Sequence, residues 1–246
     1  MADACFDAYA ARYDAWYDSE VGRPIFASEV ACLRPFIHRH PGSGLEIGVG
    51  SGRFAQALDI EYGVDPSSAL LRMARTRGIR DVMAAGENLP FPDEVFGEVL
   101  IALTLCFVRE PARVLEESRR VLRPGGGLVL GLILRESPWA EFYAWKGREG
   151  HPIYSQALFF GREDVKALLH FSGFESLEYR SCLFQPPGLS SQVPEEPRAG
   201  YHLSAGFVAV GARKGKADQG DNWINHCVQG PEDLGEDCFR VKGLAG

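Results

Sequence analysis

The sequence is short of positive charge and of long apolar segments. Its 246 residues carry 26 lysines and arginines against 33 acids, a net charge of −7, whereas a general nucleic-acid binder needs a basic surface. The apolar run over 125–134 is too short to cross a bilayer. The first residues, MADACFDAYAARYD, carry early acids and no apolar core, unlike a signal peptide. We therefore expect no nucleic-acid partner and no membrane span.

The cysteines lack any tight spacing. Six of them are scattered along the chain, which favours reduced thiols and a cytoplasmic location over a disulfide framework. His226, Cys227 and Cys238 lie near the C-terminus, but without a C-x-x-C spacing they do not predict a metal site. The six are Cys5, Cys32, Cys106, Cys182, Cys227 and Cys238.

Up to about residue 134, apolar strand-like runs alternate with amphipathic helical ones. This alternation predicts an α/β fold with a parallel, doubly wound sheet that is buried on both faces. The helix over 111–126 is expected to begin at a proline and to end at Pro-Gly-Gly. The expected strands are 44–49, 61–65, 81–86, 98–105 and 127–134, and the expected helices are 52–58, 67–78 and 111–126.

The rhythm changes after residue 135. An aromatic-rich segment over 137–160 is followed by a predicted helix over 162–174 and predicted strands over 177–184 and 205–214. From residue 215 the composition becomes polar and rich in glycine. We predict one domain over 1–214 and an irregular tail over 215–246.

Three glycines stand where the first strand should lead into a helix, in LEIGVGSGRF over 45–54. Glycine permits a positive φ and the close approach of a ligand, and ligands of open α/β sheets bind beyond the carboxyl ends of the strands. A dinucleotide-binding loop would read G-x-G-x-x-G, but Arg53 stands where its third glycine belongs. Glu46 would lie near the loop and attract a cation. The glycines are Gly48, Gly50 and Gly52.

Four segments, in order, resemble the motifs of the class I S-adenosylmethionine-dependent methyltransferases. They are LEIGVGSGRFA, GVDPS, AAGENLPFPDEVFGEV and RVLRPGGGLVLG, and the match spans about 45–134. The likeness is greatest to the small-molecule branch (type 11) that includes the quinone-biosynthesis methyltransferases. It implies a Rossmann-like, mostly parallel seven-stranded sheet with an antiparallel last strand, and S-adenosylmethionine as the cofactor with S-adenosylhomocysteine as the product.

The resemblance also implies roles for individual residues. The glycine loop would wrap the amino-acid end of the cofactor, supported by Glu46, and Asp65 would accept both ribose hydroxyls. Ala85 replaces the aspartate that often contacts the adenine amine in this family, which leaves adenine recognition open. The residues implied to border the adenine are Gly86, Glu87 and Leu89, and those beneath the methionine moiety are Leu103 and Thr104.

In the resembled family the N-terminal helix and the segment after the fifth strand cover the cofactor, so 1–30 and 137–160 are expected to form a lid. Both segments are rich in aromatic residues, which either build the acceptor pocket or pack the lid onto the sheet. Tyr13, Trp139 and Tyr143 are the predicted pocket walls. His151 is the candidate general base, because imidazole titrates near physiological pH, although a loop histidine can also be incidental.

Because orientation alone can contribute about 7–11 kcal/mol to such a reaction, no catalytic triad is required. We expect in-line methyl transfer to a small-molecule acceptor that the sequence does not identify. One alternative is a non-catalytic cofactor-binding module that acts through a protein partner. Another is a methyltransferase acting on protein or tRNA, although the negative charge and LTLCF over 103–107, in place of an NPPY-like motif, disfavour nucleic-acid bases.

Overall fold

The computed structural model describes residues 2–215. The tail predicted over 215–246, with His226, Cys227 and Cys238, lies outside the described residues except for Gly215, so the domain boundary and the irregular tail stay predictions. Within the described part, no helix is both long and apolar enough to cross a membrane. Cys32, Cys106 and Cys182 are free thiols.

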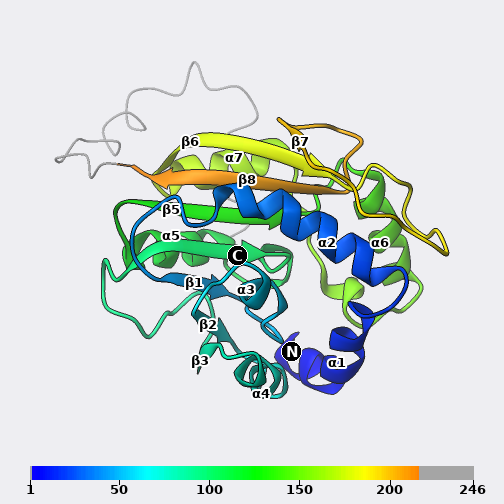
Figure 1. Ribbon diagram of the computed structural model, residues 1–246, viewed down its shortest axis with the longest axis horizontal. Coiled ribbons are helices and arrows are strands. Elements are labelled where there is room, and N and C mark those ends of the chain that lie inside the picture. Colours follow the sequence, from blue (N-terminus) through cyan, green and yellow to red (C-terminus); the bar gives the residue numbers. More distant parts are fainter. Residues whose placement is uncertain (1, 216–246) are drawn as a thin grey trace, which may run out of the picture. The chain divides into compact units, whose positions relative to one another are not determined.

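The elements follow the predicted alternation of strands and helices (Figure 1). The strands are β1 (Gly44–Ile47), β2 (Tyr62–Asp65), β3 (Arg80–Met83), β4 (Phe96–Ala102), β5 (Leu122–Leu132), β6 (Phe174–Cys182), β7 (Arg198–Ala199) and β8 (Phe207–Lys214). The α-helices are α1 (Ala2–Trp16), α2 (Gly22–Leu33), α3 (Arg53–Ala57), α4 (Ser68–Thr76), α5 (Pro111–Val121), α6 (Pro138–Arg148) and α7 (Arg162–Phe171). Short 3₁₀ helices are η1 (Arg34–Phe36), η2 (Leu105–Phe107) and η3 (Tyr154–Gln156).

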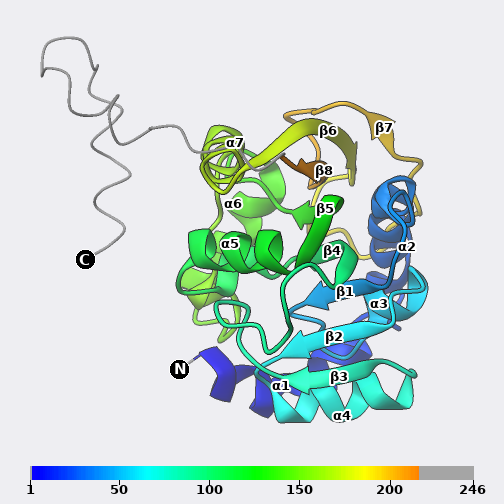
Figure 2. The ribbon, with the colours of Figure 1, turned by 90° about the vertical axis from the view of Figure 1, so that its left-hand side faces the viewer.

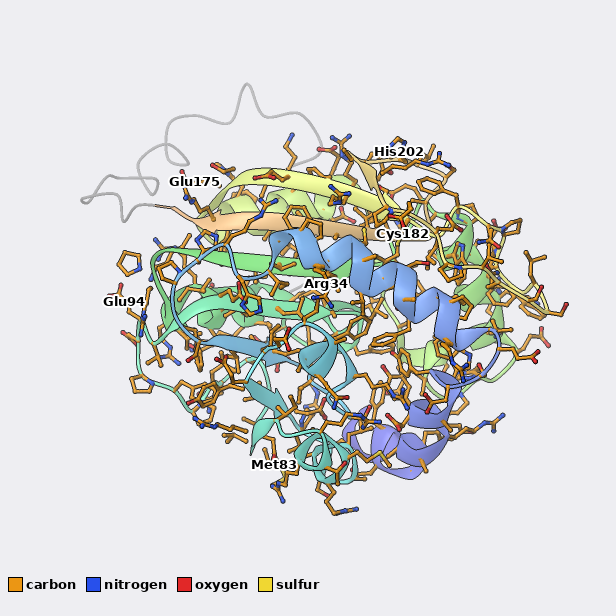
Figure 3. The ribbon with its side chains drawn as sticks, viewed as in Figure 1. Arg34, Met83, Glu94, Glu175, Cys182 and His202 are labelled. Atoms are coloured by element: carbon orange, nitrogen blue, oxygen red, sulfur yellow. The ribbon has the colours of Figure 1, made fainter. Side chains whose placement is uncertain are left out.

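The strands form one sheet in the order β3-β2-β1-β4-β5-β8-β6-β7. Strands β1 to β5 pair in parallel, and β8 pairs antiparallel with β5 and β6. The predicted Rossmann-like fold is confirmed, and the two-residue β7 adds an eighth strand to the seven expected. In Figure 3, Met83 at the end of β3 and His202 just after β7 lie towards opposite edges of the sheet.

The sheet separates two hydrophobic cores, because successive side chains of a strand point to opposite faces. In β4, Val99 and Ile101 pack with α5 and α7, whereas Leu100 and Ala102 pack with α2 and α3. Figure 2 shows these helix pairs on the two sides of the sheet. All of β4 is buried, so this central strand and its neighbours hold their carboxyl ends in fixed positions.

The helix predicted over 111–126 is shorter than expected. It begins at Pro111, as predicted, but ends at Val121, and Leu122 already pairs with Phe96 in the sheet. The strand therefore starts five residues before the predicted position of 127. Pro124 and the positive φ of Gly125, 71°, are incompatible with a continued helix.

Candidate active site

The carboxyl ends of the first four strands surround a cavity of about 360 Å³. The strand order reverses at β1, which has β2 on one side and β4 on the other, and such a switch point is where open α/β sheets bind ligands. We call this space the first cavity. Its lining includes Phe6, Tyr13, Gly48, Gly50, Asp65, Ala85, Gly86, Glu87, Leu103, Thr104 and Phe107.

The glycine loop forms one wall of the first cavity. Gly48 has a φ of 72°, and a Cβ there would overlap the Thr104 side chain, whose hydroxyl donates to the Gly48 carbonyl at 3.3 Å. Gly50 has a φ of 52°, but a Cβ there would meet nothing closer than Tyr13 at 4.0 Å. A side chain at residue 50 would therefore occupy the cavity. Gly52 does not line the cavity, because it precedes α3 and packs closely against Ala74 of α4.

Asp65 ends β2 and lines the first cavity with its side chain mostly buried, since only 8% of the residue is exposed. Its Oδ2 accepts a hydrogen bond from the Gly50 amide at 2.9 Å, and its Oδ1 accepts one from the Ser67 amide at 2.8 Å. The carboxylate thus joins the glycine loop to the start of α4. The amides of Gly48 and Val49 complete this junction by donating to the Val64 carbonyl.

Glu46 lies beneath the loop and does not line the first cavity. Leu45 and Ile47 point into the core with α5, so Glu46 points to the opposite face of the sheet. Its Oε2 has no hydrogen-bond partner among the described residues. Burial raises the pKa of this carboxyl well above its usual range, although a hydrogen bond from the Ala55 backbone opposes the shift.

The residues after β3 form the far wall of the first cavity. Ala85, Gly86 and Glu87 line it, and the Glu87 Oε1 accepts a hydrogen bond from the Arg109 amide at 3.0 Å. That bond holds the turn before α5 against the cavity. Leu89, predicted to border the adenine, is 4% exposed and packs in the core instead of lining the cavity.

A second cavity, of about 340 Å³, adjoins the first. Tyr13, Leu103 and Phe107 line both cavities. Leu103 has a φ of 54°, a conformation that a leucine rarely adopts and that costs roughly 1–2 kcal/mol. Its amide nevertheless donates to the Gly131 carbonyl at 2.8 Å, which fixes the strained residue at the junction between the two cavities. Such strained residues are concentrated at functional sites.

The N-terminal helix is tied to the glycine loop by ion pairs. Arg53, the residue after the last glycine, contacts Asp14 at 2.7 Å and Asp18 at 2.6 Å, and Arg77, at the C-terminal end of α4, contacts Asp14 at 2.9 Å. The two arginines hold the pKa of the Asp14 carboxyl well below its usual range, against the opposing effect of burial. These contacts hold α1 over the loop and place Tyr13 near Gly50.

Aromatic residues of α6 and η3 line the second cavity. The rings of Tyr143 and Tyr154 lie 4.4 Å apart between centroids, and His151 lies 4.5 Å from Tyr154. Burial, with Lys146 and Arg12 nearby, lowers the pKa of His151, so its imidazole is neutral at neutral pH. Trp139, predicted as a pocket wall, lines neither cavity and is buried, with its Nε1 donating to the Gln185 carbonyl at 3.1 Å.

The prediction from sequence missed several residues of the second cavity. Glu29 of α2 is 3% exposed and contributes to the lining. The signal was present in IFASEVACL over 25–33, where one acid stands among apolar residues. Other lining residues not singled out as cavity walls include Arg12, Cys106, Lys146, Ile153 and Tyr154.

Comparison with known proteins agrees with this geometry. Residues 45–130 match the methyltransferase domain family model. A solved S-adenosylmethionine-dependent methyltransferase from Thermotoga maritima, described as a possible histamine N-methyltransferase, is 34% identical with a TM-score of 0.79, and the match covers 87% of this chain and 100% of that one. The chain belongs to the S-adenosylmethionine-dependent methyltransferase family. It is such a methyltransferase, and S-adenosylmethionine is its cofactor.

Two curated relatives extend the comparison. An uncharacterised Mycobacterium tuberculosis protein is 49% identical over 82% of this chain and 71% of that protein. A ubiquinone/menaquinone biosynthesis C-methyltransferase from Bordetella avium is 32% identical over 57% of this chain and 60% of that protein. The second supports the resemblance to the small-molecule branch.

The described residues fit the cofactor. The open space at the Gly50 Cβ position leaves room for a ligand against the loop backbone. The Oε2 of Glu46, two residues before Gly48, has no hydrogen-bond partner among the described residues, although Glu46 does not itself line the first cavity. Asp65 brings a carboxylate to the end of the neighbouring strand β2, where an acid can accept hydrogen bonds from hydroxyl groups.

Proposed function

We propose that this methyltransferase binds S-adenosylmethionine in the first cavity and transfers its methyl group to a small molecule in the second. The observation that carries the proposal is the common wall, since Tyr13, Leu103 and Phe107 border both spaces. A ligand in each cavity would meet at these residues. Holding two reactants in such an arrangement can supply about 7–11 kcal/mol towards the barrier.

In the cofactor half, the backbone does most of the binding. The Gly48–Gly52 loop would surround the amino-acid end, Asp65 would accept the ribose hydroxyls, and Gly86 and Glu87 would border the adenine. The cofactor supplies a methyl group on a positively charged sulfur. Thr104 and Leu103, just after β4, would lie beneath the methionine moiety, and the hydrogen bond from the Leu103 amide to the Gly131 carbonyl holds Leu103 at the junction.

In the acceptor half, side chains from α1, α2, α6 and η3 orient the acceptor and exclude water. The volume of about 340 Å³ suits a small molecule. Tyr13 and Tyr143 keep their proposed role as pocket walls, and Trp139 would support α6 from behind. His151 remains our proposed general base, because its lowered pKa leaves the imidazole free to accept a proton at neutral pH.

The names of two relatives are consistent with a small acceptor. One is described as a possible histamine N-methyltransferase and the other as a ubiquinone/menaquinone biosynthesis C-methyltransferase. A protein or tRNA acceptor fits less well, because α1, α2 and α6 contribute the walls of the second cavity and leave a space of small-molecule size. The predicted cytoplasmic location agrees with the three free thiols of the described part.

Titration calorimetry tests the cofactor half, and a screen of acceptors tests the transfer. S-adenosylhomocysteine should bind, whereas NAD should not. Formation of S-adenosylhomocysteine from S-adenosylmethionine should then be measured with small amines, phenols, thiols and activated carbon acids, and with bulk protein and tRNA. Formation with the macromolecules alone would overturn the small-molecule proposal. S-adenosylhomocysteine binding without methyl transfer to any acceptor would favour the non-catalytic module.

A further inference from the structure

Glu29 is a buried acid without a role in the proposed methyl transfer. It projects from α2, is 3% exposed and lines the second cavity. Its Oε2 has no hydrogen-bond partner among the described residues. No lysine, arginine or histidine of that part of the chain lies within 4.0 Å of its carboxylate oxygens.

The surroundings of Glu29 are aromatic. Tyr13 of α1 and Tyr17, just after this helix, line the cavity, and their hydroxyls are 2.9 Å apart. Tyr143 and Tyr154 reach it from α6 and η3 as a closely spaced pair. Aromatic rings attract cations through their quadrupole, by about 0.5–2 kcal/mol each. The acid and the four rings together give this part of the second cavity a character that favours a cation.

A carboxyl group without a partner in such a place is unfavourable, because burying a polar group without a compensating hydrogen bond costs roughly 1–3 kcal/mol. A ligand that supplies a positively charged donor would remove this cost. A neutral alcohol or thiol would satisfy the carboxyl group less well, because hydrogen bonds to charged groups are about twice as strong as neutral ones.

We propose that the second cavity binds its acceptor through a basic amine nitrogen, with Glu29 as the counter-charge and the tyrosines around it. The inference rests on the proposed function, in which this cavity holds the acceptor. It assigns the acceptor class to amines and the acceptor atom to nitrogen. Glu29 also provides an oxygen that can hold the proton an ammonium group must lose before it becomes a nucleophile.

Binding of an amine has a distinctive proton balance. Burial raises the pKa of Glu29 from 4.5 to about 8, so the free protein holds a proton there at pH 6.5. An alkylammonium ion, with a pKa of about 10, would pair with the ionised carboxylate, and one proton would be released per amine bound. The titratable groups that face Glu29 or share its cavity are Tyr9, Tyr13, Tyr17, Cys32, Cys106, Tyr143, Tyr154, Cys182, Arg12, Lys146 and His151.

The neighbouring cations do not fill this role. Lys146 Nζ lies 4.6 Å from the Phe142 ring centroid and 6.0 Å from that of Tyr143, and Arg12 lies over Tyr9 at 5.9 Å. Both line the same cavity but take aromatic partners instead of the Glu29 carboxylate. The acid remains available to a ligand.

The test is calorimetric binding to the full chain saturated with S-adenosylhomocysteine. Phenethylamine and 2-phenylethanol serve as probes of similar shape, followed by primary amines from ethylamine to tryptamine. At pH 6.5, in buffers of different ionisation enthalpy, an amine should release about one proton on binding and the alcohol none. Glu29→Gln should weaken amine binding at least 10-fold and abolish the proton release, with alcohol binding changed less than twofold.

Glu141→Gln is the matched control, because Glu141 is exposed on α6 and lines neither cavity. It should change neither affinity nor proton release. An unchanged S-adenosylhomocysteine affinity in Glu29→Gln shows that the variant is folded. The proposal is overturned if no amine binds, if wild-type protein binds the alcohol as tightly, or if Glu29→Gln leaves amine affinity within twofold.

The two proposals fail in different ways. Amine binding with Glu29-dependent proton release, but no S-adenosylhomocysteine formed from S-adenosylmethionine with any bound amine, would support the amine site and sink the proposed transfer. Turnover with phenols or thiols, with amine binding indifferent to Glu29, would support the transfer and overturn the amine assignment.

Discussion

The two adjoining cavities are built from different parts of the chain. The first is formed largely by the backbone at the ends of β1 to β4, where glycines and one aspartate stand at fixed spacings. The second is formed largely by side chains from helices, gathered from segments as distant in sequence as Glu29 and Tyr154. A family can therefore keep the first cavity constant and change the second by substituting side chains.

A buried acid with an unpartnered oxygen lies near each cavity, but only one of the two acids lines its cavity. Glu46 lies under the glycine loop without lining a cavity, whereas Glu29 lines the second cavity directly. Burial raises the pKa of both carboxyls. The comparison suggests that Glu46 acts through the loop above it and that Glu29 acts on the ligand itself.

The largest expected effect concerns stability and pH in Glu29→Gln. Because the folded-state pKa of Glu29 is raised to about 8, the folded protein loses stability relative to the variant as the pH rises from about 4.5 to about 8. The loss is about 1.4 kcal/mol per pH unit, or at most about 5 kcal/mol, and is constant at higher pH. Urea unfolding of both proteins between pH 5 and 8.5 measures it.

Two further variants sharpen this measurement. Glu141→Gln, at an exposed site, should give a stability curve parallel to that of the wild type at every pH. Glu46→Gln should show the same sign as Glu29→Gln, because its pKa is raised by the same cause, but should leave amine binding unchanged. If the unfolding free energies of wild type and Glu29→Gln depend on pH in the same way, the pKa of Glu29 is not raised by folding.

The next effect belongs to the cofactor half. Asp65→Ala should weaken S-adenosylhomocysteine binding by roughly 10–150-fold, because hydrogen bonds to a charged group are worth about 1.5–3 kcal/mol. Asp164→Ala is the control, since Asp164 also accepts a backbone hydrogen bond, from Gly161 at 2.9 Å, but lies away from both cavities. Calorimetry that finds equal affinities for the two variants would remove Asp65 from the cofactor site.

The difference between the halves explains what could be predicted from sequence. Strand and glycine positions follow from local patterns, so the sequence predicts the fold, which is confirmed, and the residues expected at the strand ends. Gly52 and Leu89 were grouped with those residues because they fall within the same motifs. The structure shows that one packs between helices and the other in the core.

The acceptor half depends on tertiary packing that spacing does not encode. Tyr143 and Trp139 lie four residues apart on α6, yet the first lines the second cavity and the second lines neither. Glu29 was missed because a single acid in a helix is ordinarily solvent-exposed. Only the packing of α2 against the sheet brings it to the cavity.

A smaller effect is expected from a methyl group in the glycine loop. Gly50→Ala would fill cavity space, and overpacking of about 1–2 kcal/mol corresponds to a roughly 5–30-fold loss of S-adenosylhomocysteine affinity. Gly125→Ala has the same kind of backbone strain, with a φ of 71° and nothing within 4 Å of the added Cβ, but lies outside both cavities. Thermal unfolding should shift similarly in both variants. Comparable cofactor affinity in the two would show that Gly50 does not face the ligand.

The smallest effect tests whether the aromatic wall selects the acceptor or only packs the lid. Tyr143→Phe keeps the ring against Tyr154 and removes one neutral hydroxyl, worth about 0.5–1.5 kcal/mol. We expect the acceptor KM to rise by roughly 2–10-fold, with S-adenosylhomocysteine affinity unchanged. Tyr62→Phe also loses one hydroxyl, which accepts a hydrogen bond from Arg80 at 3.0 Å. Tyr62 begins β2 and lines neither cavity, so this variant should leave the KM unchanged. A lower melting temperature with no change in KM would assign Tyr143 to packing alone, and the selectivity of the second cavity would then depend on Glu29 and the α1 tyrosines.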